Sequence, residues 1–186
     1  MKNYIFTIIM GFVFSIPPMS AIAQTISSSI ADGGSVVDIN EGSSLHYSWI
    51  TLNDADAPIQ IEDTGIVVTR ILETFFSKGF LVSSVPITAF EIRFVLYDIF
   101  GSHMKTLSAT EVIDVATGEK FDFPNWGWGI YGNEAHEIFT VAAFVAQVRT
   151  ADGEVWRYDE DAIAEELVKI QIQTTTEDLE SAGEEG

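Results

Sequence analysis

The stretch from Pro86 to Gly101 reads PITAFEIRFVLYDIFG and decides the fold of this chain. One set of alternate positions holds large apolar side chains, Phe90, Ile92, Phe94 and Leu96. The positions between them hold a mixed, amphipathic set, Glu91, Arg93, Val95 and Tyr97. A period of two places one apolar stripe on one face of an extended strand. Such a stripe needs a second apolar surface to cover it, so the stretch predicts a sheet that packs over a core.

The N-terminal residues have the pattern of a secretory signal peptide. A basic start at Lys2 precedes the apolar run Ile5–Ile16, and Ala21-Ile22-Ala23 forms an A-x-A cleavage site. The apolar run is too short for a membrane-spanning helix. We therefore expect residues 1–23 to be a signal peptide and the protein to be exported, periplasmic or extracellular, with no membrane insertion after cleavage.

The charge balance narrows the classes of partner. The chain has 28 acidic and 9 basic residues, a net charge of −19, and no cysteine. Such a surface repels phosphate backbones, so we expect no nucleic-acid partner. Without disulfides, the apolar core alone has to stabilise the fold.

Short strands separated by turns are predicted along most of the chain. Residues 24–44 are rich in Ser and Gly and predict a flexible arm, or at best one short edge strand. Strands are expected at 45–52, at 59–69 with a bulge or a bend at Gly65, at 80–82, in one or two pieces at 103–115, and at 138–148. Residues 70–85 also favour a strand, although part of the segment fits a helical stripe. The run 138–148 is apolar on both faces, which is typical of a strand covered on both sides.

The hairpin around Asp152-Gly153 can be predicted in detail. A two-residue loop would place Arg149 opposite Trp156, whereas a three-residue loop with a left-handed Gly153 places Val148 opposite Trp156. Only the second register groups apolar side chains on one face. We therefore predict the three-residue loop, with Trp156 directed inward.

One helix is predicted at the C-terminal end, over Asp159–Gln171. Asp159 can cap it, and Ile163, Leu167 and Ile170 form one apolar stripe that should dock on the sheet. The acidic residues 174–186 predict a disordered tail.

No catalytic or metal-binding motif stands out. The three histidines, His46, His103 and His136, and the acids near them have no spacing typical of a triad. The pairs Asp54/Asp56 and Asp159/Asp161 and the group Glu134, His136 and Glu137 lack the ordered ligand spacing of a calcium loop. We expect no catalytic residues, no metal and no cofactor.

The aromatic, glycine-rich segment 121–132 offers the candidate binding residues Trp126, Trp128 and Tyr131. These rings can stand outward as a stacking platform for a sugar or a peptide. Alternatively they fold inward and close one end of the sandwich.

Two motifs carry a resemblance to a known family. FVLYD at Phe94–Asp98, followed by Ile99-Phe100-Gly101, and VRTADGEVW at Val148–Trp156 look like strand motifs of FxLYD-type and related exported bacterial immunoglobulin-like domains. The resemblance spans about residues 89–158. It implies a small β-sandwich with a binding or scaffolding role, and it brings no catalytic residues.

Together these patterns predict a mainly all-β protein, an immunoglobulin-like antiparallel β-sandwich with one C-terminal α-helix, over residues 45–173. A closed barrel is the alternative fold. We expect a non-enzymatic protein that binds another macromolecule, a protein or a glycan, or serves as a structural accessory. The alternatives are a glycan- or peptide-binding module that uses the aromatic segment, and a hydrolase whose site assembles only in three dimensions.

Overall fold

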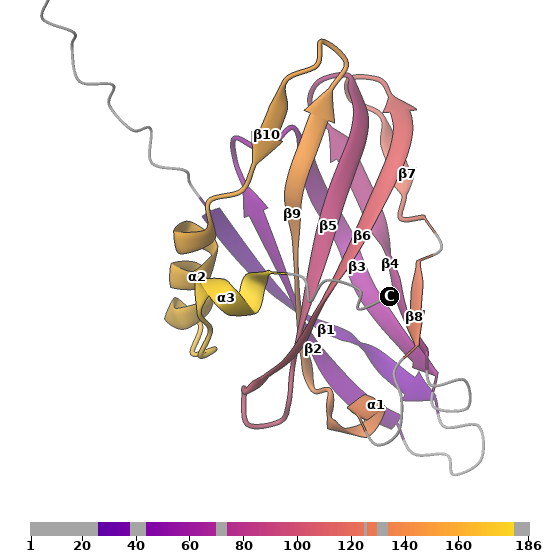
Figure 1. Ribbon diagram of the computed structural model, residues 1–186. Helices are drawn as coiled ribbons and strands as arrows, with labels where there is room; N and C mark the ends of the chain where they lie inside the picture. The colour runs from indigo at the N-terminus through magenta and orange to yellow at the C-terminus, as the bar shows by residue number, and fades with distance from the viewer. Residues whose placement is uncertain (1–25, 38–43, 70–73, 125, 130–133, 181–186) are drawn as a thin grey trace, which may run out of the picture.

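The computed structural model describes residues 26–37, 44–69, 74–124, 126–129 and 134–180. It is a mainly β, two-sheet sandwich with a C-terminal helix, which confirms the predicted fold class (Figure 1). The predicted signal peptide, residues 1–23, lies outside the described residues.

The larger sheet has six strands. Five of them run in the order β1 (Ile26–Val37), β2 (Ser44–Asp54), β9 (Thr140–Thr150), β5 (Ile87–Tyr97) and β6 (His103–Val115), and β10 (Val155–Arg157) also pairs with β9. The pairs are antiparallel except for β2 and β9, which are parallel. This parallel pair departs from the purely antiparallel arrangement that was predicted.

The smaller sheet is built around β4. It contains β3 (Ile59–Thr69), β4 (Thr74–Ser83), β7 (Lys120–Asp122) and β8 (Gly127–Gly129), and the last two pair with successive parts of β4. The predicted strand character of residues 70–85 is confirmed for 74–83, whereas 70–73 lie outside the described residues. The register of β3 and β4 shifts between Glu62 and Gly65, which confirms that the strand is interrupted at this glycine, as predicted.

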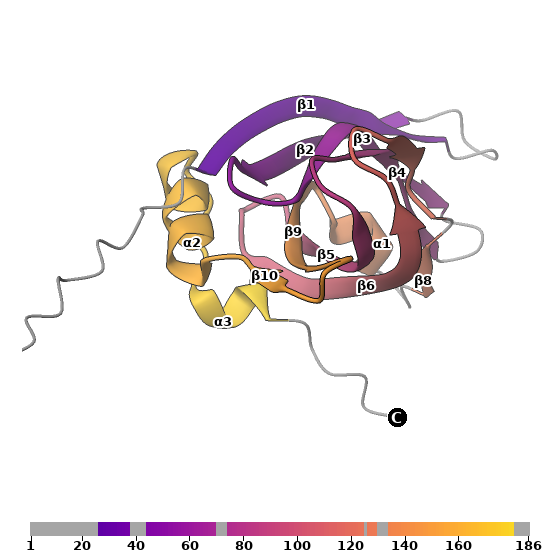
Figure 2. The ribbon, with the colours of Figure 1, turned by 90° about the horizontal axis from the view of Figure 1, so that it is seen from above.

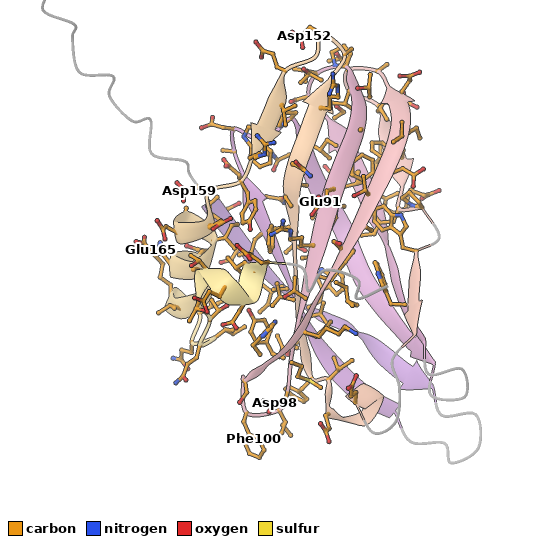
Figure 3. The ribbon with its side chains drawn as sticks, in the orientation of Figure 1. Glu91, Asp98, Phe100, Asp152, Asp159 and Glu165 are labelled. Atoms are coloured by element: carbon orange, nitrogen blue, oxygen red, sulfur yellow. The ribbon has the colours of Figure 1, made fainter. Side chains whose placement is uncertain are left out.

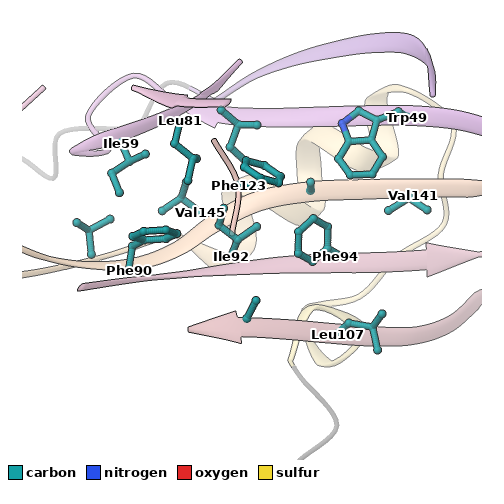
Figure 4. Close-up of a cluster of buried hydrophobic side chains, with 14 of the residues drawn as sticks. Trp49, Ile59, Leu81, Phe90, Ile92, Phe94, Leu107, Phe123, Val141 and Val145 are labelled. Atoms are coloured by element: carbon teal, nitrogen blue, oxygen red, sulfur yellow. The ribbon is translucent and has the colours of Figure 1, made fainter. Parts of the chain in front are cut away.

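The core between the two sheets is formed by the apolar stripe that the sequence predicts. Phe90, Ile92, Phe94 and Leu96 of β5 are buried in it together with Trp49 (Figure 4). Seen from above, the strands surround this core, and two helices lie outside the larger sheet (Figure 2).

A second apolar cluster covers the outer face of the larger sheet. Helix α2 (Glu160–Lys169) begins after Asp159, whose side chain accepts a hydrogen bond from the Ala162 amide at 3.1 Å, so the predicted cap is confirmed. Ile163 and Leu167 of α2 are buried against β2, β5 and β9. Strand β9 is therefore apolar on both faces, as predicted.

The two ends of the domain were predicted with different success. Residues 26–37 form the edge strand β1, which bears out the edge-strand alternative over the flexible arm, although the strand is longer than the short one expected. Its antiparallel pairing with β2, with one register shift between Asp32 and Ser35, stabilises a segment with few apolar side chains. In the predicted disordered tail, residues 176–179 form helix α3 (Thr176–Leu179), and its Leu179 is completely buried in the outer cluster. A third short helix, α1 (Glu134–Glu137), precedes β9. Residues 181–186 lie outside the described residues.

Candidate binding site at the β5–β6 turn

The turn that joins β5 to β6 is fixed by the side chain of one residue, Asp98. Its Oδ1 accepts hydrogen bonds from the amides of Phe100 and Ser102, both at 2.8 Å. The Asp98 amide donates to the Ser102 carbonyl at 3.0 Å, and the Gly101 amide donates to the Asp98 carbonyl at 3.1 Å. Gly101 has a φ of +78°, in the left-handed region that favours glycine. The sequence Asp-x-x-Gly therefore specifies a closed, well-ordered turn.

The two residues between Asp98 and Gly101 project into solvent at the tip of the hairpin. Phe100 is 90% exposed and Ile99 is 65% exposed. Figure 3 shows Phe100 at the end of the molecule, beyond Asp98. Because the turn is rigid, a partner that covers these side chains has little backbone entropy to remove.

The residues before the turn explain why it stays fixed. Leu96 is buried in the core between the sheets, and Tyr97 is buried in the outer cluster. Burial raises the pKa of Tyr97 to about 12, and its hydroxyl donates to Thr174 Oγ1 at 3.2 Å. In the Leu-Tyr-Asp sequence, Leu96 thus packs in the core between the sheets, Tyr97 packs in the outer cluster, and Asp98 closes the turn.

Two hollows flank the tip, one on each face of the hairpin. The first has a volume of about 260 Å³ and is lined by Leu96, Met104, Lys105, Glu134, Glu137 and Ile138. The second has a volume of about 440 Å³ and is lined by the turn, the start of β6, α2 and the C-terminal segment, through residues that include Ser102, His103, Val168, Thr174 and Asp178. Together the described residues of the two hollows include three acids, Glu134, Glu137 and Asp178, and one lysine, Lys105.

His103 connects the base of the hairpin to the C-terminal segment. Its Nδ1 lies 3.1 Å from Asp178 Oδ1, and its Nε2 lies 3.0 Å from Thr106 Oγ1. This hydroxyl–imidazole–carboxylate order is that of a catalytic triad. However, Thr106 is only 2% exposed, and its hydroxyl donates to the main-chain carbonyl of Asp178. The buried hydroxyl cannot reach a substrate. The geometry therefore indicates that His103 and Thr106 hold the C-terminal segment against β6, and it gives no support to the hydrolase alternative.

The aromatic segment that the sequence singled out is directed toward the core. The ring of Trp126 lies 6.0 Å from that of Phe90, and the ring of Trp128 lies 5.3 Å from that of Phe94, both edge to face. Both tryptophans are partly buried against the inner core, whereas Tyr131 lies outside the described residues. This placement favours the inward-packing alternative over a stacking platform.

The structure brings no set of metal ligands together within its described residues. Of the acids considered from the sequence, Asp159 caps α2, and Asp54 accepts a hydrogen bond from the Asp56 amide at 2.9 Å. The side chains of His46 and His136 lie outside the described part of the chain.

The turn directly follows the FVLYD motif in the sequence, but the sequence did not predict that Ile99 and Phe100 are exposed. Ile99 and Phe100 follow a strand of large apolar residues, so they look like further core residues. The signal that separates them is the Asp-x-x-Gly spacing, which ends the strand and reverses the chain.

Comparison with known proteins adds little to this geometry. The sequence matches no known protein family, and it matches no curated protein. A crystal structure of a hypothetical protein from Peptoclostridium difficile 630 is similar, with a TM-score of 0.46 and 12% identity over 64% of this chain and 94% of that chain. A similarity at this level is not informative about function. No helix among the described residues is long and apolar enough to cross a membrane.

Proposed function

We propose that this chain is an exported, non-enzymatic binding protein that docks another protein through the turn Asp98–Ser102. The observation that carries the proposal is a phenylalanine side chain that is 90% exposed on a turn closed by its own hydrogen bonds. Aromatic anchors held in place before binding are typical of the few residues that dominate protein interfaces. The signal-peptide pattern of residues 1–23 supports export.

The surroundings of the tip define the chemistry of the partner. Asp98 lies in the turn itself, the described residues of the two hollows beside the hairpin include three further acids and one lysine, and the chain as a whole has a net charge of −19. A complementary surface would therefore have an apolar pocket for Ile99 and Phe100 and a basic rim. The acidic residues concerned are Asp98, Glu134, Glu137 and Asp178.

The first experiment is site-specific photocrosslinking in cells that express the protein. Benzoylphenylalanine is placed at position 100 and, as the matched control, at position 80, where a second phenylalanine is 36% exposed on the smaller sheet. We expect a discrete adduct from position 100 that position 80 does not give. Its mass identifies the partner, and the absence of an adduct at position 100 would contradict the proposal.

The second experiment measures the affinity for the partner so identified. Phe100→Ala should weaken binding by about 30-fold, as expected for a hot spot of about 2 kcal/mol, while Phe80→Ala should leave it within about twofold. Because Phe100 is exposed, its truncation should change the free energy of unfolding by less than about 0.5 kcal/mol. An unchanged affinity of a folded Phe100→Ala variant would refute the proposed docking site.

A further inference from the structure

A groove of about 290 Å³ lies on the outer face of the larger sheet, on the opposite half of β5 from the turn Asp98–Ser102. It crosses β6, β5, β9 and β10. Figure 3 shows Glu91, which lines it, on the part of β5 that α2 and α3 leave uncovered. The groove is independent of the site proposed above.

The strand registers arrange the groove in two rows. Across the four strands, one row has Val112, Ala89, Arg149 and Val155 in neighbouring positions. The next row on the same face has Thr110, Glu91, Gln147 and Arg157. The residues between the rows, Phe90, Val148 and Trp156, are directed into the core.

Two arginines therefore lie side by side on one face. Arg149 and Arg157 are diagonal neighbours across β9 and β10, a relation that brings side chains to about 7–8 Å at the backbone. Like charges in such positions repel each other, although exposure to solvent weakens the repulsion. Both side chains are exposed, and neither forms an ion pair within the described part of the chain.

This absence of partners is unexpected in a chain with about three acids for each basic residue. The carboxylate that lines the groove, Glu91, is already occupied. Its Oε1 pairs with Arg93 Nε at 3.0 Å, and its Oε2 accepts a hydrogen bond from Gln147 Nε2 at 2.6 Å. The two guanidinium groups are thus the free charges of the groove.

The groove also presents apolar surface beside these charges. Val155 lines the groove and is 42% exposed, and Val112, at the other end of the first row and just outside the lining, is 81% exposed. Among the described residues that line the groove, no exposed aromatic ring is available to stack on a sugar, because Phe90 is buried. A guanidinium fork matches a carboxylate in geometry and charge.

We infer that this groove binds an acidic peptide segment, with carboxylates on Arg149 and Arg157 and a small apolar side chain against Val155 or Val112. The carboxylates offset the repulsion between the two arginines. Thr110 and Gln147 line the same groove and supply polar groups for the peptide backbone.

The test is fluorescence anisotropy with a labelled hexapeptide, VDVEVD, and a matched neutral peptide, VNVQVN. The acidic peptide should bind at least about tenfold more tightly, as expected for charge-assisted hydrogen bonds of about 1.5–3 kcal/mol. Arg149→Gln and Arg157→Gln should each weaken its binding by at least about tenfold. Lys105→Gln removes one charge from the same sheet outside the groove and should change binding by less than about twofold.

Three outcomes would overturn the inference. The first is equal binding of the two peptides, and the second is an equal loss in Lys105→Gln, which would mean that any loss of positive charge weakens binding, wherever it lies on the sheet. The third is full competition by sulfate at the concentration of the peptide, which would mean a site for any anion. Because both arginines are exposed, circular dichroism of the variants should match the parent protein, so that loss of binding reports on the groove.

Discussion

Replacing Arg93 should loosen the C-terminal segment from the larger sheet and lower the free energy of unfolding. Its Nη1 donates to the Tyr158 hydroxyl at 2.7 Å and to the Leu179 carbonyl at 2.8 Å, and its Nε pairs with Glu91 at 3.0 Å. The guanidinium also lies over the Tyr158 ring, 5.2 Å from its centre. Burial raises the pKa of Tyr158 to about 12, so its hydroxyl remains protonated at neutral pH.

Arg93→Met keeps the aliphatic part of the side chain and removes these polar contacts. Each hydrogen bond contributes about 1 kcal/mol or somewhat more, and the side chain is 19% exposed, so solvent replaces part of the loss. We expect a decrease of about 2–3 kcal/mol in the free energy of unfolding, measured by urea denaturation with tryptophan fluorescence and far-UV circular dichroism. The control is Arg149→Met, an exposed arginine of the same sheet, with an expected change below about 0.5 kcal/mol.

A double-mutant cycle with Tyr158→Phe separates the two partners of Nη1. We expect a coupling energy of about 1 kcal/mol between Arg93 and the Tyr158 hydroxyl. A loss below about 0.5 kcal/mol in Arg93→Met, or no coupling to Tyr158, would refute the idea that this arginine fastens the segment.

Three further predictions concern stability. Gly153 has a φ of +94° with open space around its Cα, so Gly153→Ala should cost about 1 kcal/mol in urea unfolding through backbone strain alone. The indole N–H of Trp49 donates to Thr51 Oγ1 at 2.9 Å, whereas the buried indole N–H of Trp156 has no partner among the described residues. Trp49→Phe should therefore lower the free energy of unfolding by at least about 1 kcal/mol more than Trp156→Phe does. Burial raises the pKa of Asp54 above 3.8, so the folded state binds this proton more tightly than the unfolded chain, and that stability is lost as the pH rises through the raised value. The free energy of unfolding of Asp54→Asn should therefore increase relative to that of the parent protein as the pH rises above 3.8, measured by urea denaturation, and a difference that stays constant with pH would contradict the assignment.

The features that the sequence predicts well are those set by neighbouring residues. In the hairpin of β9 and β10, Val148 lies opposite Trp156 and Gly153 has a left-handed φ, as the three-residue loop requires. Turn chemistry and the alternation of side chains fix this register without help from the rest of the chain. The cap at Asp159 and the interruption of the strand at Gly65 are of the same kind.

The features that could not be predicted depend on residues far apart in the chain. Strand β1 is stabilised by its pairing with β2, and no apolar alternation in its own sequence announces it. The segment around Leu179 looked too acidic to fold, yet one buried leucine and hydrogen bonds from Arg93 and Thr106 fix it. The residues near Leu179 do not indicate that Arg93 and Thr106, more than 70 residues earlier in the chain, donate hydrogen bonds to this segment.

Strand β5 carries both proposed binding surfaces, the groove around Glu91 and the tip at Phe100. Phe100 follows Glu91 by nine residues, a span of at most about 30 Å, and β5 is buried between two neighbouring strands and two apolar layers. A strand packed in this way transmits little change in shape, and sites this far apart usually act additively. We therefore expect Phe100→Ala to leave the affinity for the acidic peptide within about twofold, and Arg157→Gln to leave the affinity for the crosslinked partner equally unchanged. If one variant weakens both ligands by tenfold, the two surfaces belong to one continuous interface and the separation argued here is wrong.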